Sequence, residues 1–332
     1  MSVHFANARA RPLLRAGRAA RSCAVAGEEV REGIGTTSGA VRHARLPRPK
    51  REAVDLTNFS KNLARSESGI WVPAEGAGRE HVSFPEAAYA ACFELEDASF
   101  WFAHRNEVIS LALAQHPFEG PFLDVGGGNG AVSRRLATDG IDPVVLEPGP
   151  EGASNARKRG LPTVVCATLE KAGFERGSFG GAGLFDVIEH VEDDAELLAH
   201  VHDVLRPNGV LAVTVPAYSW LWSAEDELAG HHRRYTLAGL RRALEGTGFD
   251  VRYETYFFAA LTAPIFFARS VRYRLGRRPS KEVWDEAGKQ HTPSAVSRAV
   301  MDRLLAPELH AIRSGKRLPF GTSCLAIAVS RS

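Results

Sequence analysis

This chain has few cysteines, little net charge and no long apolar run. Its 332 residues include four cysteines, whose wide spacing suggests neither a zinc site nor a disulfide framework. The formal net charge of +2 argues against a dedicated nucleic-acid binder, because phosphate neutralisation needs a concentrated basic surface. No apolar run reaches membrane-spanning length. With 44% hydrophobic residues the chain can bury one large α/β core, and we expect a cytoplasmic protein.

The first 65 residues differ in kind from the rest. The first acidic residue is Glu28, and the residues before it carry arginine, alanine and serine without a long apolar core, so they are not a secretory signal. We expect residues 1–65 to be a disordered leader or the result of a start codon assigned too far upstream. An organellar transit peptide and a basic nucleic-acid arm are the alternatives. Residues 66–332 would then form the functional domain.

The most informative segment is a glycine turn between a short apolar strand and a helix. Residues 122–125 read as the end of a buried strand and residues 131–137 as the first turns of a helix. Gly126, Gly128 and Gly130 lie between them. Glycines there let main-chain N–H groups approach a ligand, and the following helix presents unpaired N–H groups at its positive end. A polar or anionic ligand is therefore expected at this turn.

Two acidic residues narrow the choice of ligand. The glycines alone also fit a dinucleotide motif, G-x-G-x-x-G/A, ending at Ala131. Asp124, two residues before the first glycine, would repel a pyrophosphate but could accept a hydrogen bond from the ammonium of S-adenosylmethionine. Glu147 ends the next apolar strand, 21 positions after Gly126, where a carboxylate that bonds ribose hydroxyls is expected. Glu147 supports a nucleoside ligand without choosing between the two cofactors.

Four segments in order resemble the class I S-adenosylmethionine-dependent methyltransferases, especially the bacterial small-molecule branch similar to ubiquinone and menaquinone biosynthesis methyltransferases. They are the residues at 123–130, 145–148, 185–194 and 204–216. The resemblance implies a Rossmann-like, doubly wound sheet of seven strands, mostly parallel, flanked by helices. Alternating strand and helix patterns from 122 to 255 point to the same fold class. Residues 324–329 should add one antiparallel C-terminal strand beside the strand near 250–257.

The resemblance also implies a set of cofactor-binding residues. Many relatives carry an aspartate after the third strand to bond the adenine amino group, whereas this chain has Thr168, so the backbone of Leu169 is the expected adenine contact. Asp186 ends the fourth strand, at the sheet edge where ligands of such folds bind. The predicted cofactor-binding residues are Asp124, Gly126, Gly128, Gly130, Glu147, Thr168, Leu169 and Asp186.

Methyl transfer needs in-line positioning of a nucleophile and, for a hydroxyl, a base. His190 and His231 are the candidate catalytic bases, because an imidazole can take a proton near neutral pH. Asp186, Glu189 and His190 also resemble the acidic and histidine set with which some class I O-methyltransferases hold a divalent ion. Three ligands from one short segment seldom close a metal site unaided, so we predict no metal site.

Substrate residues are expected in two insertions and a cap. Residues 217–236 carry Trp222, Arg234 and Tyr235 and are predicted to form a lid over the acceptor. Residues 256–317 form a second insertion, in which an apolar and aromatic stretch with an arginine-rich flank could touch a membrane surface or a lipid-linked acceptor. A helical cap is expected at about 85–115.

The sequence therefore predicts methyl transfer from S-adenosylmethionine to a small-molecule acceptor, in first place a hydroxyl oxygen, with histidine assistance. The acceptor could be hydrophobic or lipid-linked, with no nucleic-acid partner and at most peripheral membrane contact. Two alternatives stay open: an NAD(P)-dependent oxidoreductase and a non-catalytic cofactor-binding subunit.

Overall fold

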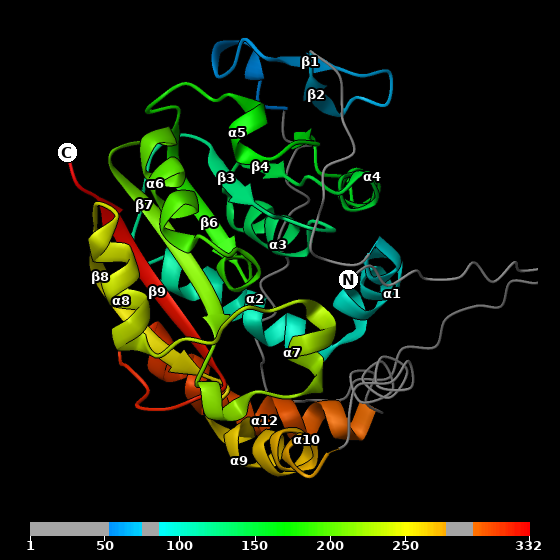
Figure 1. The fold of residues 1–332 in the computed structure, drawn as a ribbon, viewed down its shortest axis with the longest axis vertical. Helices are drawn as coiled ribbons and strands as arrows, with labels where there is room; N and C mark the ends of the chain where they lie inside the picture. The colour runs from blue at the N-terminus through cyan, green and yellow to red at the C-terminus, as the bar shows by residue number, and fades with distance from the viewer. Residues whose placement is uncertain (1–52, 75–85, 277–294) are drawn as a thin grey trace, which may run out of the picture. The chain divides into compact units, whose positions relative to one another are not determined.

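The computed structural model describes residues 53–74, 86–276 and 295–332. In this part of the chain, nine strands form one sheet in the order β1-β2-β5-β4-β3-β6-β7-β9-β8 (Figure 1). The strands are β1 (Leu63–Arg65), β2 (Trp71–Pro73), β3 (Phe122–Val125), β4 (Pro143–Leu146), β5 (Val164–Val165), β6 (Phe179–Phe185), β7 (Leu205–Pro216), β8 (Phe249–Phe257) and β9 (Ser323–Ser330).

The middle of the sheet is parallel and its C-terminal part is antiparallel. β5, β4, β3, β6 and β7 pair in parallel, which requires the helical crossovers between them. β9 runs antiparallel to both β7 and β8, so the predicted antiparallel C-terminal strand is confirmed.

The predicted count of seven strands is wrong, because a short hairpin adds two. β1 and β2 pair antiparallel, and Trp71 of β2 pairs in parallel with Val165 of β5. The hairpin follows the short 3₁₀ helix η1 (Leu56–Asn58). Residues 53–65, which we assigned to the leader, are therefore part of the folded unit. The rest of the expected leader, residues 1–52, lies outside the described residues.

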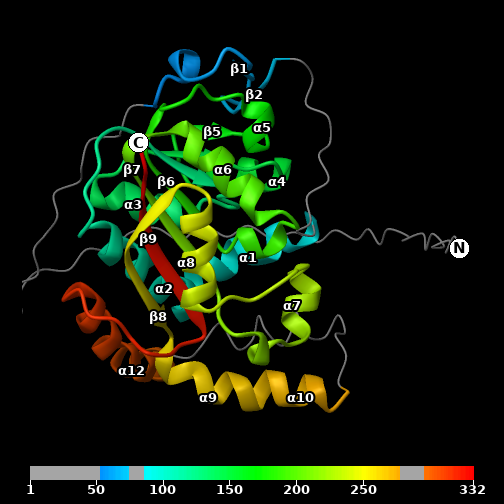
Figure 2. The ribbon, with the colours of Figure 1, turned by 60° about the vertical axis from the view of Figure 1, so that its left-hand side comes forward.

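Helices cover both faces of the sheet (Figures 1 and 2). Side chains alternate between the faces of a strand, so Leu123 joins one core cluster and Phe122 the other. α6 and α8 pack on the Leu123 side, and α2, α3 and α12 on the Phe122 side. The long helices are α1 (Glu86–Ala98), α2 (Phe100–Leu113), α3 (Ala131–Asp139), α4 (Pro150–Lys158), α6 (Asp194–Val204), α8 (Leu237–Gly246) and α12 (Ala295–Arg313).

The shorter helical segments lie in the connections and the two insertions. They are α5 (Leu169–Ala172), η2 (Ile188–His190), η3 (Ser219–Leu221), α7 (Ala224–Ala229), η4 (Ala259–Leu261), α9 (Thr262–Ile265), the π-helical segment η5 (Phe266–Ser270) and α10 (Val271–Arg274). Part of the second predicted insertion, residues 277–294, lies outside the described residues. Among the helices that are described, none combines the length and apolar character needed to cross a bilayer.

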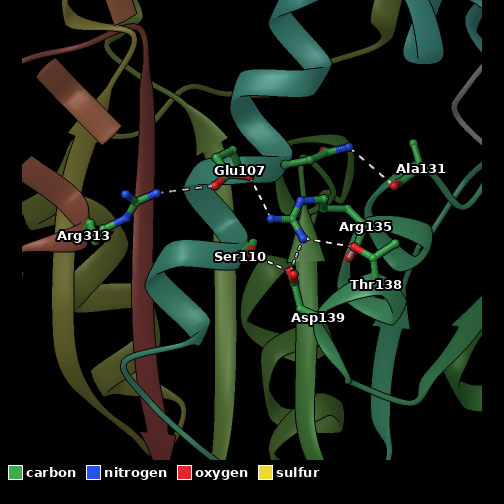
Figure 3. A network of polar contacts seen from close by, with 8 residues as sticks. Glu107, Ser110, Ala131, Arg135, Thr138, Asp139 and Arg313 are labelled. Atoms are coloured by element: carbon green, nitrogen blue, oxygen red, sulfur yellow. Dashed lines mark hydrogen bonds and ion pairs between the residues drawn. The ribbon is translucent and has the colours of Figure 1, made fainter. Parts of the chain in front are cut away.

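The range of the predicted cap holds two helices, α1 and α2. α1 ends at Ala98, and the Ser99 hydroxyl accepts a hydrogen bond from the Trp101 N–H at 3.1 Å, which starts α2. A polar network then joins α2 to α3 (Figure 3). Arg135 of α3 bonds Glu107 of α2 at 2.8 Å, and the Ser110 hydroxyl donates to Asp139 at 2.6 Å. The second cap helix is thus fixed to the helix that follows the glycine turn.

The glycine-rich strand β6 is explained by its aromatic neighbours. A side chain at Gly180 would overlap the main-chain oxygen of Glu119, and a Cβ at Gly181 would lie 2.8 Å from the Phe122 ring and 3.0 Å from the Phe118 ring. β6 therefore has glycines where the Glu119 main chain and these two rings pack against its backbone.

Gly180→Ala should lower the free energy of unfolding by about 1–3 kcal/mol, because the added methyl forces the Glu119 backbone away. Gly246→Ala is the matched control: no heavy atom of the described residues lies within 4 Å of its would-be Cβ, and alanine favours the helix by roughly 0.5–1 kcal/mol. Urea unfolding of both variants tests this. Equal stability of the two would contradict the packing explanation.

Candidate functional site

The glycine turn lies where β3 passes into α3 and has left-handed backbone geometry. Gly126, Gly128 and Gly130 have φ angles of 67°, 54° and 78°, which residues with a side chain rarely adopt. Among the described residues, no heavy atom lies within 4 Å of the position that a Gly128 Cβ would take. A ligand can therefore approach the main chain at Gly128.

Glu147 holds the turn from the end of the neighbouring strand β4. Its Oε2 accepts a hydrogen bond from the Gly128 N–H at 2.8 Å, and its Oε1 accepts one from the Gly149 N–H at 2.6 Å. The Tyr89 hydroxyl of α1 donates a third bond to Oε1 at 2.8 Å. Burial raises the pKa of Glu147 above the usual value for a carboxyl, against the effect of these three donors. A carboxylate is thus fixed beside the glycine turn.

Asp124 lies beneath the turn rather than in front of it. Its side chain is buried, and Oδ2 accepts a hydrogen bond from the Ser133 hydroxyl of α3 at 2.6 Å. A Cβ on Gly127 would lie 3.0 Å from the same oxygen. Burial raises the pKa of Asp124 to about 6, while the Ser133 bond opposes the shift. Asp124 therefore ties β3 to α3 and places a titratable carboxyl directly behind the glycines.

Asp186 follows β6 in a strained backbone conformation. Its φ angle of 58° is uncommon for a residue with a side chain. The Thr214 hydroxyl donates to its Oδ1 at 3.1 Å, and Arg105 of α2 pairs with its Oδ2. The cap helix α2 is therefore linked by charge to the end of the fourth parallel strand.

Thr168 and Leu169 begin α5 at the far side of the predicted cofactor site. The Thr168 hydroxyl accepts a hydrogen bond from the Lys171 N–H at 3.4 Å, and the Leu169 side chain is buried. The Thr168 side chain thus has a capping role in the fold. An adenine contact from this pair stays a prediction.

Both candidate bases lie in one cluster with Glu189. The rings of His190 and His231 stand edge to face with centroids 4.6 Å apart. One possible ligand atom from each of Glu189, His190 and His231 lies within 4.8 Å of the others, a spacing that could hold a divalent metal ion. Burial, followed by the neighbouring His231, lowers the pKa of His190 to about 4. His190 is therefore neutral at physiological pH.

Glu189 is the least satisfied side chain of the cluster. It is fully buried, and neither carboxylate oxygen has a hydrogen-bond partner among the residues that the structure describes. Burial and then the nearby charge of Asp186 raise the pKa of Glu189 well above the usual value. A buried carboxyl without a partner is costly, which points to a role other than stability.

His231 is oriented by Asp226 of α7. Its Nδ1 lies 2.8 Å from Asp226 Oδ1. Arg234 bonds the same carboxylate at both oxygens, at 2.7 and 2.9 Å. Although burial opposes it, the bonds from His231 and Arg234 lower the pKa of Asp226 to about 2. Asp226 therefore stays ionised and fixes the His231 imidazole through Nδ1.

The three predicted acceptor residues have different surroundings. Arg234 is engaged by Asp226 and by the main-chain oxygen of Ala217 at 3.0 Å. Tyr235 is buried, and its hydroxyl donates to Asp194 at 2.5 Å. Trp222 is half-buried, next to η3. Direct acceptor contact stays a prediction for all three.

Four residues of this region were missed by sequence reasoning: Tyr89, Arg105, Ser133 and Asp226. Ser133 stands nine positions after Asp124, one turn into the predicted helix, which is a signal that could have been used. Tyr89 and Arg105 come from helices far upstream in sequence, and no local pattern joins them to Glu147 or Asp186. Asp226 is one acid among Glu225, Asp226 and Glu227, and only the fold distinguishes it.

Comparison with known proteins agrees with this geometry. Residues 99–254 match the family model described as a methyltransferase domain. An uncharacterized protein of Mycobacterium tuberculosis is 28% identical over 153 residues, which cover 43% of this chain and 52% of the relative. A protein of Mycolicibacterium smegmatis named an S-adenosylmethionine-dependent methyltransferase is 28% identical over 161 residues, covering 47% of this chain and 62% of the relative.

Further relatives lie in quinone biosynthesis and among solved structures. The ubiquinone biosynthesis O-methyltransferase of Pectobacterium carotovorum is 28% identical over 134 residues, covering 37% of this chain and 56% of the relative. A chain of the complex between the Haloferax volcanii Trm112 methyltransferase activator and a methyltransferase is 19% identical, with a TM-score of 0.50 over 76% of this chain and 100% of that one. The chain spans between about half and two thirds of the length of these curated relatives.

The fold, the site and these matches agree on one class. Residues 99–254 are similar to the methyltransferase domain family, and the relatives named above include S-adenosylmethionine-dependent methyltransferases.

Glu189→Gln should remove a pH dependence of stability. Because the pKa of Glu189 is raised in the folded state, its contribution to stability is present below the unfolded pKa and is lost as pH rises through the folded pKa. Glutamine cannot ionise, so at pH values above the raised pKa of Glu189 the free energy of unfolding of the variant should exceed that of wild type by roughly 1–3 kcal/mol.

Urea unfolding with a chelator present, from about pH 6 to about pH 9, measures this difference. Glu192→Gln, at an exposed position nearby, is the control and should keep the wild-type pH profile. An unchanged profile for Glu189→Gln would show that the Glu189 carboxyl is not destabilised by burial.

Proposed function

We propose that the protein transfers the methyl group of S-adenosylmethionine to a hydroxyl oxygen of a small, hydrophobic or lipid-linked acceptor. The proposal rests on two sites that lie at the carboxyl ends of the parallel strands. One is the glycine turn with its buried carboxylate, Glu147, and the other is the imidazole of His231 held by Asp226. The first suits a nucleoside, and the second suits removal of a proton from an alcohol or phenol.

In this proposal the cofactor lies across the carboxyl ends of β3, β4 and β6. The main chain at Gly126, Gly128 and Gly130 receives the methionine part, and Asp124 behind it supplies the charge that favours its ammonium, directly or through water. Glu147 bonds the ribose. The remaining proposed contacts are those of the adenine with Thr168 and Leu169 and of the cofactor's methionine part with Asp186.

Tyr89 limits how Glu147 can bind a ribose. A carboxylate has about four acceptor positions, two on each oxygen. Among the described residues, Oε1 accepts from Gly149 and Tyr89 and Oε2 from Gly128, which leaves one acceptor position. Two ribose hydroxyls therefore require one donor to leave, and the Tyr89 hydroxyl is the only one of the three carried by a side chain. We expect the Tyr89 hydroxyl to release Oε1 of Glu147 when the ribose bonds both carboxylate oxygens.

Tyr89→Phe should therefore strengthen binding of S-adenosylhomocysteine, by about tenfold if the lost competing bond is worth roughly 1.5 kcal/mol. The phenylalanine ring keeps the packing of Tyr89 against Gly149 and Gly152. Glu147→Gln should weaken binding by about tenfold or more, because the amide offers one acceptor oxygen instead of two.

Calorimetric titration with S-adenosylhomocysteine, and with NADH in parallel, measures both effects. Weaker binding by Tyr89→Phe would mean that Tyr89 is a positioning residue for Glu147 rather than a competitor. Binding of NADH without S-adenosylhomocysteine would instead support the oxidoreductase alternative.

The proposed chemistry is in-line displacement at the sulfonium methyl. With Nδ1 bonded to Asp226, His231 has Nε2 left to accept the proton of the acceptor hydroxyl as its oxygen attacks the methyl carbon. The carbon–sulfur bond breaks as the oxygen–carbon bond forms, and the electron pair stays on the neutral thioether. His190, neutral and edge to face with His231, supports the position of that ring.

A divalent ion on Glu189, His190 and His231 is the second candidate for activating the acceptor. The unsatisfied, buried carboxylate of Glu189 favours it. Bound there, a hard or borderline ion would lower the pKa of a coordinated hydroxyl. His231 would then be a ligand and not a base, so chelation separates the two mechanisms: activity that survives a chelator supports the base.

His231→Gln should lower turnover by about 10²–10⁴-fold and leave affinity for S-adenosylhomocysteine unchanged, because it removes the base without touching the cofactor site. His232→Gln, at the exposed neighbouring histidine, is the matched control and should keep wild-type turnover. Release of S-adenosylhomocysteine with a panel of phenols and alcohols provides the measurement. Parallel loss of turnover and cofactor affinity would indicate a structural role for His231.

A further inference from the structure

The segment α9–η5–α10 (Thr262–Arg274) exposes an apolar side, although its most deeply buried positions are polar. Its buried positions are polar: Ser270 is fully buried and donates to the Leu221 main-chain oxygen at 2.9 Å, and Thr262 is also buried. Its exposed side carries Phe267, which is 67% exposed, and the exposed Ala263, Pro264 and Ala268. A helix in water normally presents the opposite pattern.

Neighbouring side chains extend this apolar face. Trp220 is 43% exposed and Phe320 51% exposed. Together with Phe266 and Phe267 they line an open apolar cavity of about 300 Å³. Trp220 precedes α7, Phe320 precedes β9, and the two phenylalanines lie in η5, so three separate parts of the chain bring large apolar groups to one place. Figure 2 shows α9 and α10 following one another in line beyond the end of β8. Contiguous apolar surface of this kind marks an interaction site.

Arginines stand at the end of the same segment. Arg272 and Arg274 are exposed, and the Arg274 guanidinium lies 5.5 Å from the centroid of the Phe266 ring and donates to the Trp220 main-chain oxygen at 2.8 Å. The neighbouring Arg269 is paired with Glu225 at 3.3 Å. The apolar face is thus bordered by positive charge that is held against its aromatic rings.

We propose that this face, made of Trp220, Phe267, Phe320, Arg272 and Arg274, docks on the surface of a membrane that contains anionic lipids. Exposed aromatic side chains beside arginines fit the boundary between headgroups and acyl chains, where rings insert and guanidinium groups meet phosphates. A second copy of the chain fits less well, because symmetric contact would bring like-charged arginines together. The docking is peripheral and needs no spanning segment.

The docking face is connected to the candidate site by the chain segment that runs from η3 into α7. Trp220 and Leu221 lie in η3, which two residues separate from α7, whose Asp226 orients His231. The hydrogen bond from the Ser270 hydroxyl to the Leu221 main-chain oxygen fixes the docking segment to η3. If the proposed function holds, a membrane-bound acceptor would reach His231 from this side. The docking itself does not depend on methyl transfer.

Sedimentation of the full chain with phosphatidylcholine vesicles, with and without phosphatidylglycerol, tests the proposal. We expect binding to the mixed vesicles and little to the neutral ones. Phe267→Ser should weaken that binding about tenfold, as expected for removing one inserted aromatic side chain, and Phe267→Leu should retain most of it. Arg272→Glu should weaken it about tenfold or more, and raised salt should act in the same direction.

Lys61→Glu is the matched charge control. Lys61 is 88% exposed and precedes β1, at the opposite edge of the sheet from β8, so its reversal should leave vesicle binding unchanged. Affinity for S-adenosylhomocysteine should be the same in all these variants, which separates failure of docking from failure of the proposed function. Equal binding of Phe267→Ser and wild type, equal binding to neutral and anionic vesicles, or a dimer abolished by Phe267→Ser without vesicle binding would each overturn the proposal.

Discussion

The site depends on one buried carboxylate and the two main-chain N–H groups that bond it. Glu147 leaves β4 and accepts from Gly128 in one turn and Gly149 in the next, so the ends of two neighbouring strands share a single anion. Gly128 donates its bond from a left-handed backbone conformation. Tyr89 brings the first cap helix to the same group. Turn, strand and cap are therefore held in register by one side chain.

The second half of the site is built on a separate anion. Asp226 binds Arg234 with both oxygens and still orients His231, which lets the short helix α7 carry a fixed imidazole. The Glu189 carboxylate, by contrast, is buried and accepts no hydrogen bond from the residues that the structure describes. Two acids close to His231 thus have opposite surroundings, since the pKa of Asp226 is lowered to about 2 and the pKa of Glu189 is raised. Such contrast is typical of sites that do chemistry rather than of surfaces that only support a fold.

Sequence patterns predicted the parts of this arrangement that follow from regular geometry. Glu147 could be placed beside Gly128 because parallel strands end at a common edge, and the antiparallel last strand followed from the resemblance. The hairpin of β1 and β2 could not be predicted, because strands of three residues carry no periodicity. The reason for the glycines of β6 became clear only from the fold, which places the rings of Phe118 and Phe122 against this strand. Asp226 and Tyr89 act across turns and helices, where spacing along the chain carries no information.

The hairpin has a consequence for the exposed border of the sheet. β5 has two residues, and without a neighbour its outer backbone groups would invite pairing with another chain. β2 covers that border through Trp71 and Val165, and β1, itself only three residues long, becomes the outermost strand. A short outer strand offers little to a foreign one. Residues 53–74 thus cover β5 and limit edge-to-edge pairing with other chains. A shortened chain that begins after them would expose the backbone of β5.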